Sequence, residues 1–336
     1  MNLLIIGGTQ FVGRHLVEAA CRRGDRVTVF NRGRTADELP PQVERRRGDR
    51  RADLSALAEG EWDAVIDCCG YLPSEVGDLA DALAGRFGCY AFISSVSAYA
   101  STRTPNDEDA PLGTLDDPHT EVVDGRTYGP LKALCEAALA RRVPAAQRLV
   151  IRPGLVVGPH DPTQRFTWWP ARLARAAEDG QPVLAPGDPQ RPLQFVDARD
   201  LADFVLLALD RGIRGAFNVI SPPAFTTMGG LLAACAQAAG APAAKLQWID
   251  EHTLLRADAK PWTDLPLWLP AEGEYAAFMD VPTDRAQAAG LRIRPLAETV
   301  ADTLAWWRSL PPERQAFTKA GLPPSREAVL LALARD

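Results

Sequence analysis

Two side chains four residues apart, Tyr128 and Lys132, could together carry out acid–base chemistry. A spacing of four places both on one face of a helix. A phenol of ordinary pKa, about 10, is a poor acid–base group at neutral pH, but a nearby ammonium group favours the phenolate and lowers that pKa. We therefore predict that Tyr128 exchanges a proton with a substrate oxygen and that Lys132 lowers its pKa. The alternative is an ordinary Tyr/Lys pair on a helix surface.

A group of serines follows a predicted strand upstream of this pair. The apolar run at residues 90–93 leads directly into Ser94 and Ser95. In a parallel sheet the carboxyl ends of the strands line the ligand crevice, so both serines are expected at that edge. Hydride transfer to a carbonyl carbon leaves negative charge on the oxygen, which needs hydrogen-bond donors. Ser95 is therefore predicted to hold the substrate oxygen.

The N-terminal turn has the pattern of a dinucleotide site. An apolar run at residues 3–6 is followed by a glycine-rich turn, and a helical pattern begins near residue 11. The free N–H groups and the positive dipole end of such a helix favour a pyrophosphate. The alternative is a purely structural strand–helix turn. The predicted pyrophosphate contacts are Gly7, Thr9, Gln10, Phe11 and Val12.

The ends of the second and third predicted strands bear on which dinucleotide is bound. An NAD site usually has a carboxylate after the second strand, to accept from the ribose hydroxyls. This strand instead ends in Asn31, Arg32 and Arg34. Guanidinium groups bind a 2′-phosphate through paired hydrogen bonds, so we favour NADP(H) over NAD(H); the alternative is that both arginines lie on a solvated loop. Asp49, at the end of the third strand, is placed to accept from the adenine amine, with Arg50 beside it.

These residues require a scaffold in which strand ends meet. Short apolar runs alternate with helical patterns over the first 160 residues, which predicts an α/β fold: a Rossmann-type doubly wound parallel sheet. Residues 1–165 and about 193–220 are assigned to this NAD(P)-binding domain. Residues of about 166–192 and 221–336 are assigned to a smaller, mostly helical C-terminal substrate domain. Helices are expected at 280–289 and 295–310, with one or two more in the tail, 311–336.

Five segments resemble, in order, the extended short-chain dehydrogenase/reductase family, also called the NAD-dependent epimerase/dehydratase family. They are residues 7–13, 94–99, 128–132, 152–159 and 195–202. The resemblance spans residues 1 to about 220 and implies a Rossmann domain, a C-terminal substrate domain and a site built from Ser95, Tyr128 and Lys132. It further implies cofactor contacts by Ser94, by Cys68 and Gly70 at the adenosine ribose, and by Pro153 and Gly154 at the nicotinamide.

Two positions depart from that pattern. Gln10 stands where the family usually has the middle glycine of the turn. Leu193 stands where members acting on sugar nucleotides commonly have an arginine for the substrate diphosphate, which weakens the case for such a substrate.

The segment after the sixth strand is expected to lie over the nicotinamide end of the crevice. Aromatic walls with a few polar groups are typical of small-ligand pockets. The candidate substrate contacts are Ser97, His160, Arg165 and Trp168. For Trp168 the alternative is a place in the inter-domain core.

Taken together, these features predict an NAD(P)H-dependent oxidoreductase that acts on a carbonyl or secondary alcohol of a small metabolite. One alternative is a sugar or sugar-nucleotide epimerase or dehydratase that keeps its NAD(P) bound. A second is a non-catalytic RNA-binding relative, because the turn with a non-glycine residue at position 10 also resembles chloroplast stem-loop RNA-binding proteins.

The composition limits the partners. The 336 residues carry a formal net charge of −6, whereas nucleic-acid binders normally show a basic footprint. No apolar run approaches the ~20 residues that span a bilayer, and the N-terminus lacks a cationic leader. The six cysteines show no metal-ligand spacing with the four histidines, so reduced thiols and no metal are expected. We expect a cytoplasmic protein with a small-molecule substrate and no membrane or nucleic-acid partner; the sequence also allows a homodimer.

Overall fold

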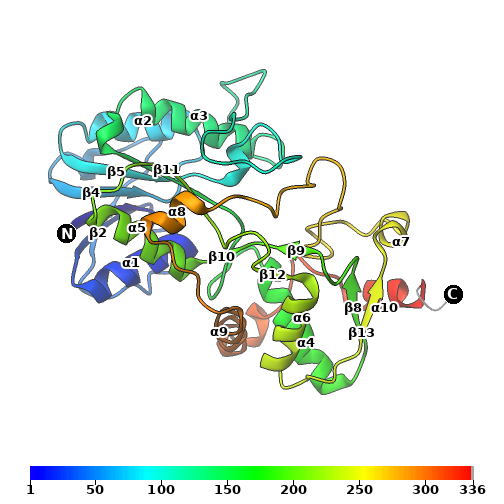
Figure 1. Ribbon diagram of the computed structural model, residues 1–336. Coiled ribbons are helices and arrows are strands. Elements are labelled where there is room, and N and C mark those ends of the chain that lie inside the picture. Colours follow the sequence, from blue (N-terminus) through cyan, green and yellow to red (C-terminus); the bar gives the residue numbers. More distant parts are fainter. Residues whose placement is uncertain (334–336) are drawn as a thin grey trace.

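The computed structural model describes residues 1–333. Its first domain is built on a seven-stranded parallel sheet of order β11-β6-β5-β4-β1-β2-β3 (Figure 1). The order reverses between β1 and β4, where a doubly wound sheet binds its ligand. The predicted α/β Rossmann-type fold is therefore confirmed. The strands are β1 (Asn2–Ile6), β2 (Arg26–Asn31), β3 (Glu44–Arg47), β4 (Trp62–Asp67), β5 (Phe87–Ile93), β6 (Arg148–Pro153) and β11 (Gly215–Val219).

Helices cover both faces of this sheet because its central strands are apolar on both sides (Figure 1). In β1, Leu3 and Ile5 enter the core under one pair of helices, whereas Leu4 and Ile6 enter the core under the other. The first pair is α1 (Phe11–Arg23) and α5 (Ala198–Asp210); the second is α2 (Pro73–Ala82) and α3 (Tyr128–Ala140).

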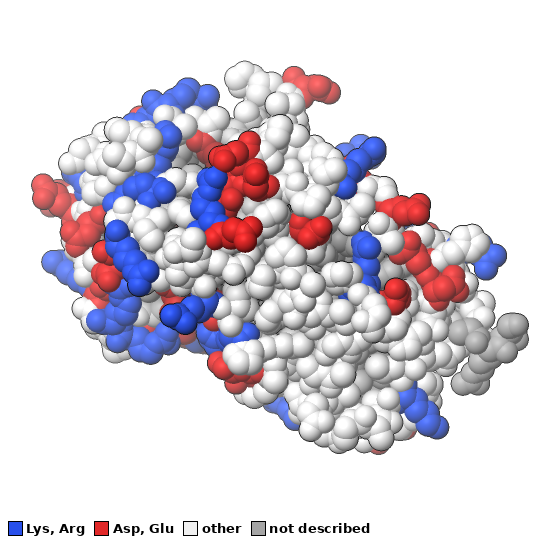
Figure 2. Space-filling model, viewed as in Figure 1, with Lys and Arg blue, Asp and Glu red and all other residues white. Residues whose placement is uncertain are grey.

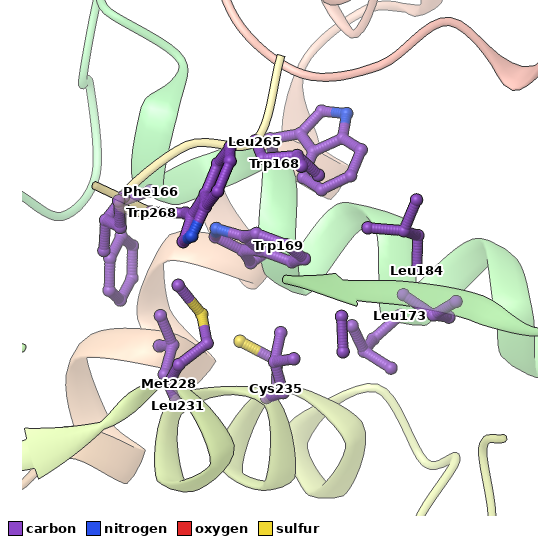
Figure 3. Packing of buried hydrophobic residues seen from close by; sticks show 14 of the residues in the cluster. Phe166, Trp168, Trp169, Leu173, Leu184, Met228, Leu231, Cys235, Leu265 and Trp268 are labelled. Atoms are coloured by element: carbon purple, nitrogen blue, oxygen red, sulfur yellow. The ribbon is translucent and has the colours of Figure 1, made fainter. Parts of the chain in front are cut away.

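The second domain has an aromatic core. In Figure 3, Met228 and Cys235 point toward Trp169, whose indole nitrogen donates to the carbonyl of Pro266 at 2.8 Å. The parallel strand pair β8–β13 lies in a region that was expected to be mostly helical. The sequence did not reveal these strands because segments of only four residues show no diagnostic periodicity. The elements of the second domain are α4 (Arg165–Asp179), β8 (Val183–Pro186), α6 (Met228–Ala238), β13 (Leu246–Ile249), α7 (Glu251–Arg256), α9 (Leu296–Ser309) and α10 (Pro324–Leu333). Two further two-stranded sheets pair β7 (Val156–Val157) with β10 (Val196–Asp197), and β9 (Pro192–Leu193) with β12 (Thr226–Thr227).

One late segment returns to the first domain. Helix α8 (Asp284–Ala289) is shorter than the predicted 280–289, since Pro282 disfavours helical backbone just before it. Ala286 and Leu291 are buried in the core beneath α1 and α5. The assignment of all residues beyond 221 to the second domain therefore fails for this stretch. In the tail, a short 3₁₀ helix (Pro312–Arg314) precedes α10, and residues 334–336 of the predicted tail helices lie outside the described residues.

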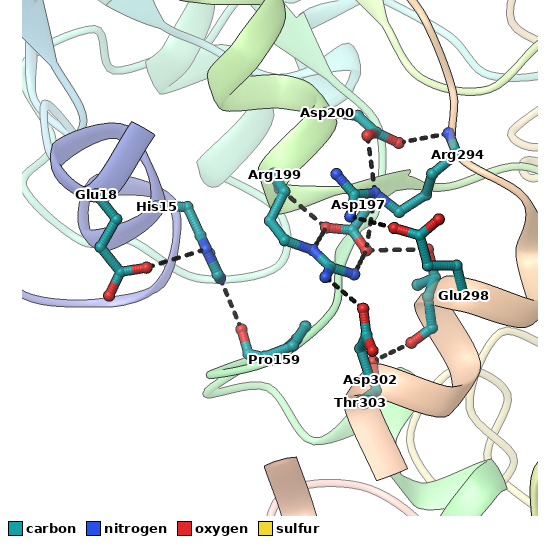
Figure 4. A network of polar contacts seen from close by, with 11 residues as sticks. His15, Glu18, Pro159, Asp197, Arg199, Asp200, Arg294, Glu298, Asp302 and Thr303 are labelled. Carbon is teal, nitrogen blue, oxygen red and sulfur yellow. Dashed lines mark hydrogen bonds and ion pairs between the residues drawn. The ribbon is translucent and has the colours of Figure 1, made fainter. Parts of the chain in front are cut away.

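A buried polar network joins α5 to α9 (Figure 4). The carboxylate of Asp197 caps α5 by accepting from the Arg199 backbone N–H at 2.9 Å, and it also accepts from the Thr299 hydroxyl at 2.9 Å. Burial acts to raise the pKa of Asp197, but the hydrogen bonds of Arg199 and the nearby Arg294 hold it below its ordinary value. The segment at 195–202 thus serves as a joint between the domains.

The molecular surface is unevenly charged. Acidic and basic side chains are interspersed over the first domain in Figure 2, whereas the region around α6 carries few. Helix α6 itself contains no Asp, Glu, Lys or Arg. Within residues 1–333 we find no helix with the length and apolar character needed to cross a bilayer.

Candidate dinucleotide and catalytic site

The glycine-rich turn brings α1 tightly against β1. A Cβ atom on Gly13 would lie 2.7 Å from the backbone nitrogen of Gly8, so α1 approaches the turn this closely only with glycine at position 13. Phe11, the first residue of α1, has a φ of 36°, a left-handed conformation that costs about 1–3 kcal/mol for a non-glycine residue. Strain of this kind is often found at ligand sites, and here it lies where the helix meets the turn.

A cleft of about 390 Å³ opens above this turn at the carboxyl ends of β1, β2 and β4. It brings together residues that the sequence analysis assigned to one site, although Gly7 and Cys68 lie 61 positions apart in the chain. Tyr71 also lines it and was missed, although its position just after Gly70 at the end of β4 is the signal that identified its neighbours. The predicted cofactor residues in its lining are Gly7, Thr9, Gln10, Phe11, Val12, Asn31, Arg32, Arg34, Asp49, Arg50 and Cys68.

Two of these side chains have structural contacts within the protein. The amide of Asn31 donates to the carbonyl of Gly7 at 3.0 Å, which fixes the turn to the end of β2. Arg50 forms two 2.7 Å hydrogen bonds with Asp67, a fully buried carboxylate that also accepts from the Tyr90 hydroxyl at 2.9 Å. Burial acts to raise the pKa of Asp67, but Arg50 holds it below the ordinary value. Arg50 therefore neutralises a buried charge at the floor of the cleft.

Arg32 and Arg34 differ from the other arginines nearby. Both are exposed and line the cleft. Within residues 1–333 neither has a carboxylate within ion-pair distance, whereas all three arginines of β3 do. Two uncommitted guanidinium groups at the end of β2 therefore face the cleft.

The start of α3 packs against the turn that follows β5, which contains Ser95 and Ser97. A Cβ atom on Gly129 would lie 2.0 Å from the Ser97 carbonyl oxygen, so only glycine allows α3 to approach this turn. The approach brings the Tyr128 phenol close to Ser95, whose hydroxyl accepts from the Ser97 backbone N–H at 3.1 Å. Burial raises the pKa of Tyr128, and the nearby Ser95 hydroxyl opposes that rise.

Lys132 is almost fully buried, with 3% of its surface exposed. Its ammonium group donates to the carbonyls of Gly70 and Ile93, both at 2.8 Å, and lies 5.0 Å from the ring centre of Tyr71. Burial lowers the pKa of Lys132. The expected lowering of the Tyr128 pKa is not found in the protein without a cofactor, because burial of the phenol raises that pKa. Lys132 thus links α3 to the chain beyond the ends of β4 and β5.

Ser94 belongs to a buried network that the sequence analysis missed. Its hydroxyl donates to Glu136 at 2.5 Å, and Glu136 receives two further hydrogen bonds, of 3.0 and 2.7 Å, from Arg152. Arg152 also donates to the Tyr99 hydroxyl at 3.1 Å. The helical spacing that pairs Tyr128 with Lys132 extends to Glu136, and this was the signal available. The network fixes the inner face of α3 against β5 and β6.

The remaining predicted residues fall into separate places. Pro153 ends β6, and Gly154 packs directly against Ile220. Arg165 begins α4, half-buried, 5.5 Å from the Trp262 ring centre, and its Nε has no hydrogen-bond partner among the described residues. Trp168 lies in the core of the second domain, where it faces the C-terminal segment, because a Cβ on Gly321 would lie 2.0 Å from its ring.

His160 lies between the domains rather than beside Ser95 or Tyr128. Its ring centre is 5.8 Å from that of His15 and 5.3 Å from that of Trp306. Burial, followed by the charge of Arg14, lowers the pKa of His160 to about 4.

This pKa predicts a contribution to acid sensitivity. The ordinary histidine pKa is about 6.5, so below that pH the unfolded chain binds a proton that folded His160 does not take up until about pH 4. The free energy of unfolding should therefore fall as the pH drops through this window. His160→Asn, which suits the left-handed backbone there (φ 68°), should reduce the loss measured by urea unfolding between about pH 7 and about pH 5. The exposed His252 provides the matched control; equal losses in His160→Asn and His252→Asn would contradict the prediction.

Comparison with known proteins places this geometry in a family. Residues 3–219 match the NAD dependent epimerase/dehydratase family. The sequence is 29% identical over 262 residues to the chloroplast stem-loop binding protein of 41 kDa b from Arabidopsis thaliana, covering 72% of this chain and 64% of that protein. The matched stretch thus spans less than two thirds of that relative.

Two solved structures share the fold over nearly the whole chain. The enzyme WbmH from Bordetella bronchiseptica, in complex with NAD+, has a TM-score of 0.66 at 17% identity, covering 92% of this chain and 98% of that one. The human epimerase family protein SDR39U1 (isoform 2), with NADPH, has a TM-score of 0.62 at 19% identity, covering 91% and 99%. By its sequence match, and with the order of motifs that the sequence analysis identified, the chain belongs to the NAD dependent epimerase/dehydratase family.

Proposed function

We propose that this protein is an NADP(H)-dependent oxidoreductase that transfers hydride to or from a carbonyl or secondary alcohol of a small metabolite. One observation carries the proposal: the Tyr128 phenol lies beside Ser95, on the same helix as the buried ammonium group of Lys132, which donates to the Gly70 carbonyl beyond the end of β4. The relatives support a nucleotide cofactor, since the similar structures were solved with NAD+ and with NADPH.

The cleft fits a dinucleotide. The tight turn at Gly8 and Gly13 leaves the N–H groups at the start of α1 open toward a pyrophosphate. Arg32 and Arg34 would hold a 2′-phosphate, and Asp49 would accept from an adenine amine. The predicted contacts to the rest of the cofactor are Cys68, Gly70, Ser94, Tyr128, Lys132, Pro153 and Gly154.

The chain's own residues would then handle the proton. The cofactor, when bound, supplies or accepts the hydride. Ser95 holds the substrate oxygen by a hydrogen bond, and Tyr128 gives it a proton. The phenol of Tyr128 is protonated at neutral pH, so it can donate its proton to the substrate oxygen. The Lys132 ammonium would stabilise the phenolate that remains and would donate to the nicotinamide ribose of a bound cofactor.

The substrate side is expected to include Ser97 and Arg165. Ser97 is adjacent to the Ser95 hydroxyl, and Arg165 presents a half-buried guanidinium whose burial lowers its pKa. A substrate with an acidic group would suit this arginine. His160 and Trp168, placed between the domains and in the core, have a weaker claim.

The direct test is a screen of carbonyl compounds for oxidation of NADPH, followed at its absorbance near 340 nm, with the Tyr128→Phe variant as a blank. Substrate-dependent consumption of NADPH supports the proposal. A second candidate, an epimerase or dehydratase that recycles its hydride, is favoured by the family and would convert substrate with no net consumption. RNA binding that is salt-dependent and unaffected by Tyr128→Phe would instead support the non-catalytic alternative, which the plant relative suggests.

The cofactor preference gives a separate prediction. Arg32→Ala should weaken NADPH binding by about tenfold or more while leaving NADH binding nearly unchanged, because one charge-assisted contact to the 2′-phosphate is lost. The dissociation constants can be measured by fluorescence titration. Arg26→Ala, at the other end of β2 and 76% exposed, is the matched control. An unchanged ratio of the two constants in Arg32→Ala would show that the arginine does not read the 2′-phosphate.

A further inference from the structure

A second cavity lies in the C-terminal domain, bounded by α4, α9 and the segment that precedes α10. Its volume is about 370 Å³, within the range of about 300–1,000 Å³ found for small-ligand sites. None of the residues lining it lines the glycine-turn cleft. It is therefore distinct from that cleft, and Trp168 is the one residue of its lining that the sequence analysis named as a candidate substrate contact.

Aromatic side chains form two sides of this cavity. Trp168 of α4 is held edge-to-face against Trp169, with ring centres 4.6 Å apart. On the other side Trp307 stacks on Phe317 at an interplanar angle of 24°. Flat aromatic walls favour a ligand that itself has a flat apolar body.

Residues 315–319 form the outer wall of the cavity and are held by hydrogen bonds. The side chain of Gln164 donates to the Ala316 carbonyl at 2.8 Å and accepts from the backbone N–H groups of Thr318 and Lys319 at 2.8 and 3.0 Å. The indole nitrogen of Trp307 donates to the Gln315 carbonyl at 3.2 Å. These bonds hold the segment in place along the opening, so the space is preformed.

The inner end of the cavity has an excess of positive charge. Arg172 and Arg175 both line it and share a single carboxylate, Glu327, at 2.7 and 3.3 Å. Within residues 1–333, Arg172 is 4% exposed and its Nη1 has no hydrogen-bond partner. Its Nε donates to Glu327 and its Nη2 to the Pro182 carbonyl at 2.7 Å, so among the described residues Nη1 alone lacks the acceptor that a buried polar group normally has. Burial, together with the charge of Arg172, lowers the pKa of Arg175, as expected for cations crowded together.

We propose that this cavity binds a small aromatic molecule with one negative charge, an aryl carboxylate being the simplest. The ring would lie between Trp168 and the Trp307–Phe317 stack. The carboxylate would lie on Arg175 and supply the acceptor that Arg172 lacks. One negative charge on the ligand would balance the net positive charge of two guanidinium groups and one carboxylate. A neutral aromatic ligand would leave that positive charge uncompensated.

The test compares 2-naphthoate with its neutral analogue, 2-naphthamide, by quenching of tryptophan fluorescence in the full-length protein. We expect naphthoate to bind about tenfold more tightly than the amide, the usual gain from one charge-assisted contact. Arg175→Gln should reduce naphthoate to the affinity of the amide. Arg22→Gln, an exposed arginine on α1 with 67% of its side chain accessible, should leave both affinities unchanged.

Two further measurements locate the site. Ala316→Leu, an exposed position in the cavity wall, should weaken both naphthalene compounds by narrowing the cavity. Saturating NADPH should displace neither. Equal affinities for the acid and the amide, an unaltered preference in Arg175→Gln, or displacement by NADPH would each overturn the proposal. None of these results depends on whether the protein is an oxidoreductase.

Discussion

The Tyr128→Phe variant should lose turnover by about 10²–10⁴-fold, the usual contribution of a positioned acid–base group, and should bind NADPH nearly as well as the parent protein. The substitution removes only the hydroxyl near Ser95 and leaves the ring and the start of α3 in place. Turnover is measured by NADPH oxidation with the best substrate from the screen, and binding by fluorescence titration.

Tyr71→Phe is the matched control for this prediction. Tyr71 lines the cleft, its ring centre is 6.4 Å from that of Tyr128, and its ring contacts the Lys132 ammonium through its face. Loss of its hydroxyl should leave that contact and most of the turnover intact. If the two variants lose turnover equally, Tyr128 has no special role in proton transfer.

Glu136→Gln should destabilise the protein by about 3–5 kcal/mol, as is typical when one partner of a buried ion pair is removed. Arg152 is 5% exposed and would be left with an uncompensated charge beneath α3. The free energy of unfolding is measured by urea denaturation of the full-length protein at neutral pH.

An exposed pair on the same helical layer gives the comparison. Arg142 binds Asp81 at 2.8 Å, with 33% and 60% of the two side chains exposed. Such pairs contribute about 0–1 kcal/mol, so Asp81→Asn should have a small effect. A loss in Glu136→Gln no larger than in Asp81→Asn would mean that the Ser94–Glu136–Arg152 network does not stabilise the packing of α3.

The first domain was predictable because its signals are local. The glycine turn, the apolar strands and the Tyr128–Lys132 spacing each occupy a short stretch, and the parallel-sheet rule places the strand ends together. The order of motifs then identified the family. The domain assignment failed where α8 returns to the sheet. The sequence around Ala286 and Leu291 does not indicate in which of the two domain cores these side chains are buried.

The electrostatics of the site were less predictable than its geometry. Spacing shows that Lys132 shares a helix face with Tyr128, but the direction of its ammonium depends on the carbonyls of Gly70 and Ile93, which come from two different strand ends. Likewise two arginines that line the cleft differ in a way that the sequence does not reveal: Arg50 is bound to buried Asp67, whereas Arg32 has no carboxylate partner among the described residues. Both differences arise from contacts between segments distant in the chain.

The return of α8 to the sheet has a consequence for dissecting this protein. A fragment ending near residue 220 would retain every strand of the large sheet. The apolar core residues that Ala286 and Leu291 cover would, however, be exposed to solvent. It would also lose Thr299, which donates to buried Asp197. The nucleotide-binding half therefore cannot be excised with a single cut, and an expression fragment of it needs the later stretch grafted back through a linker.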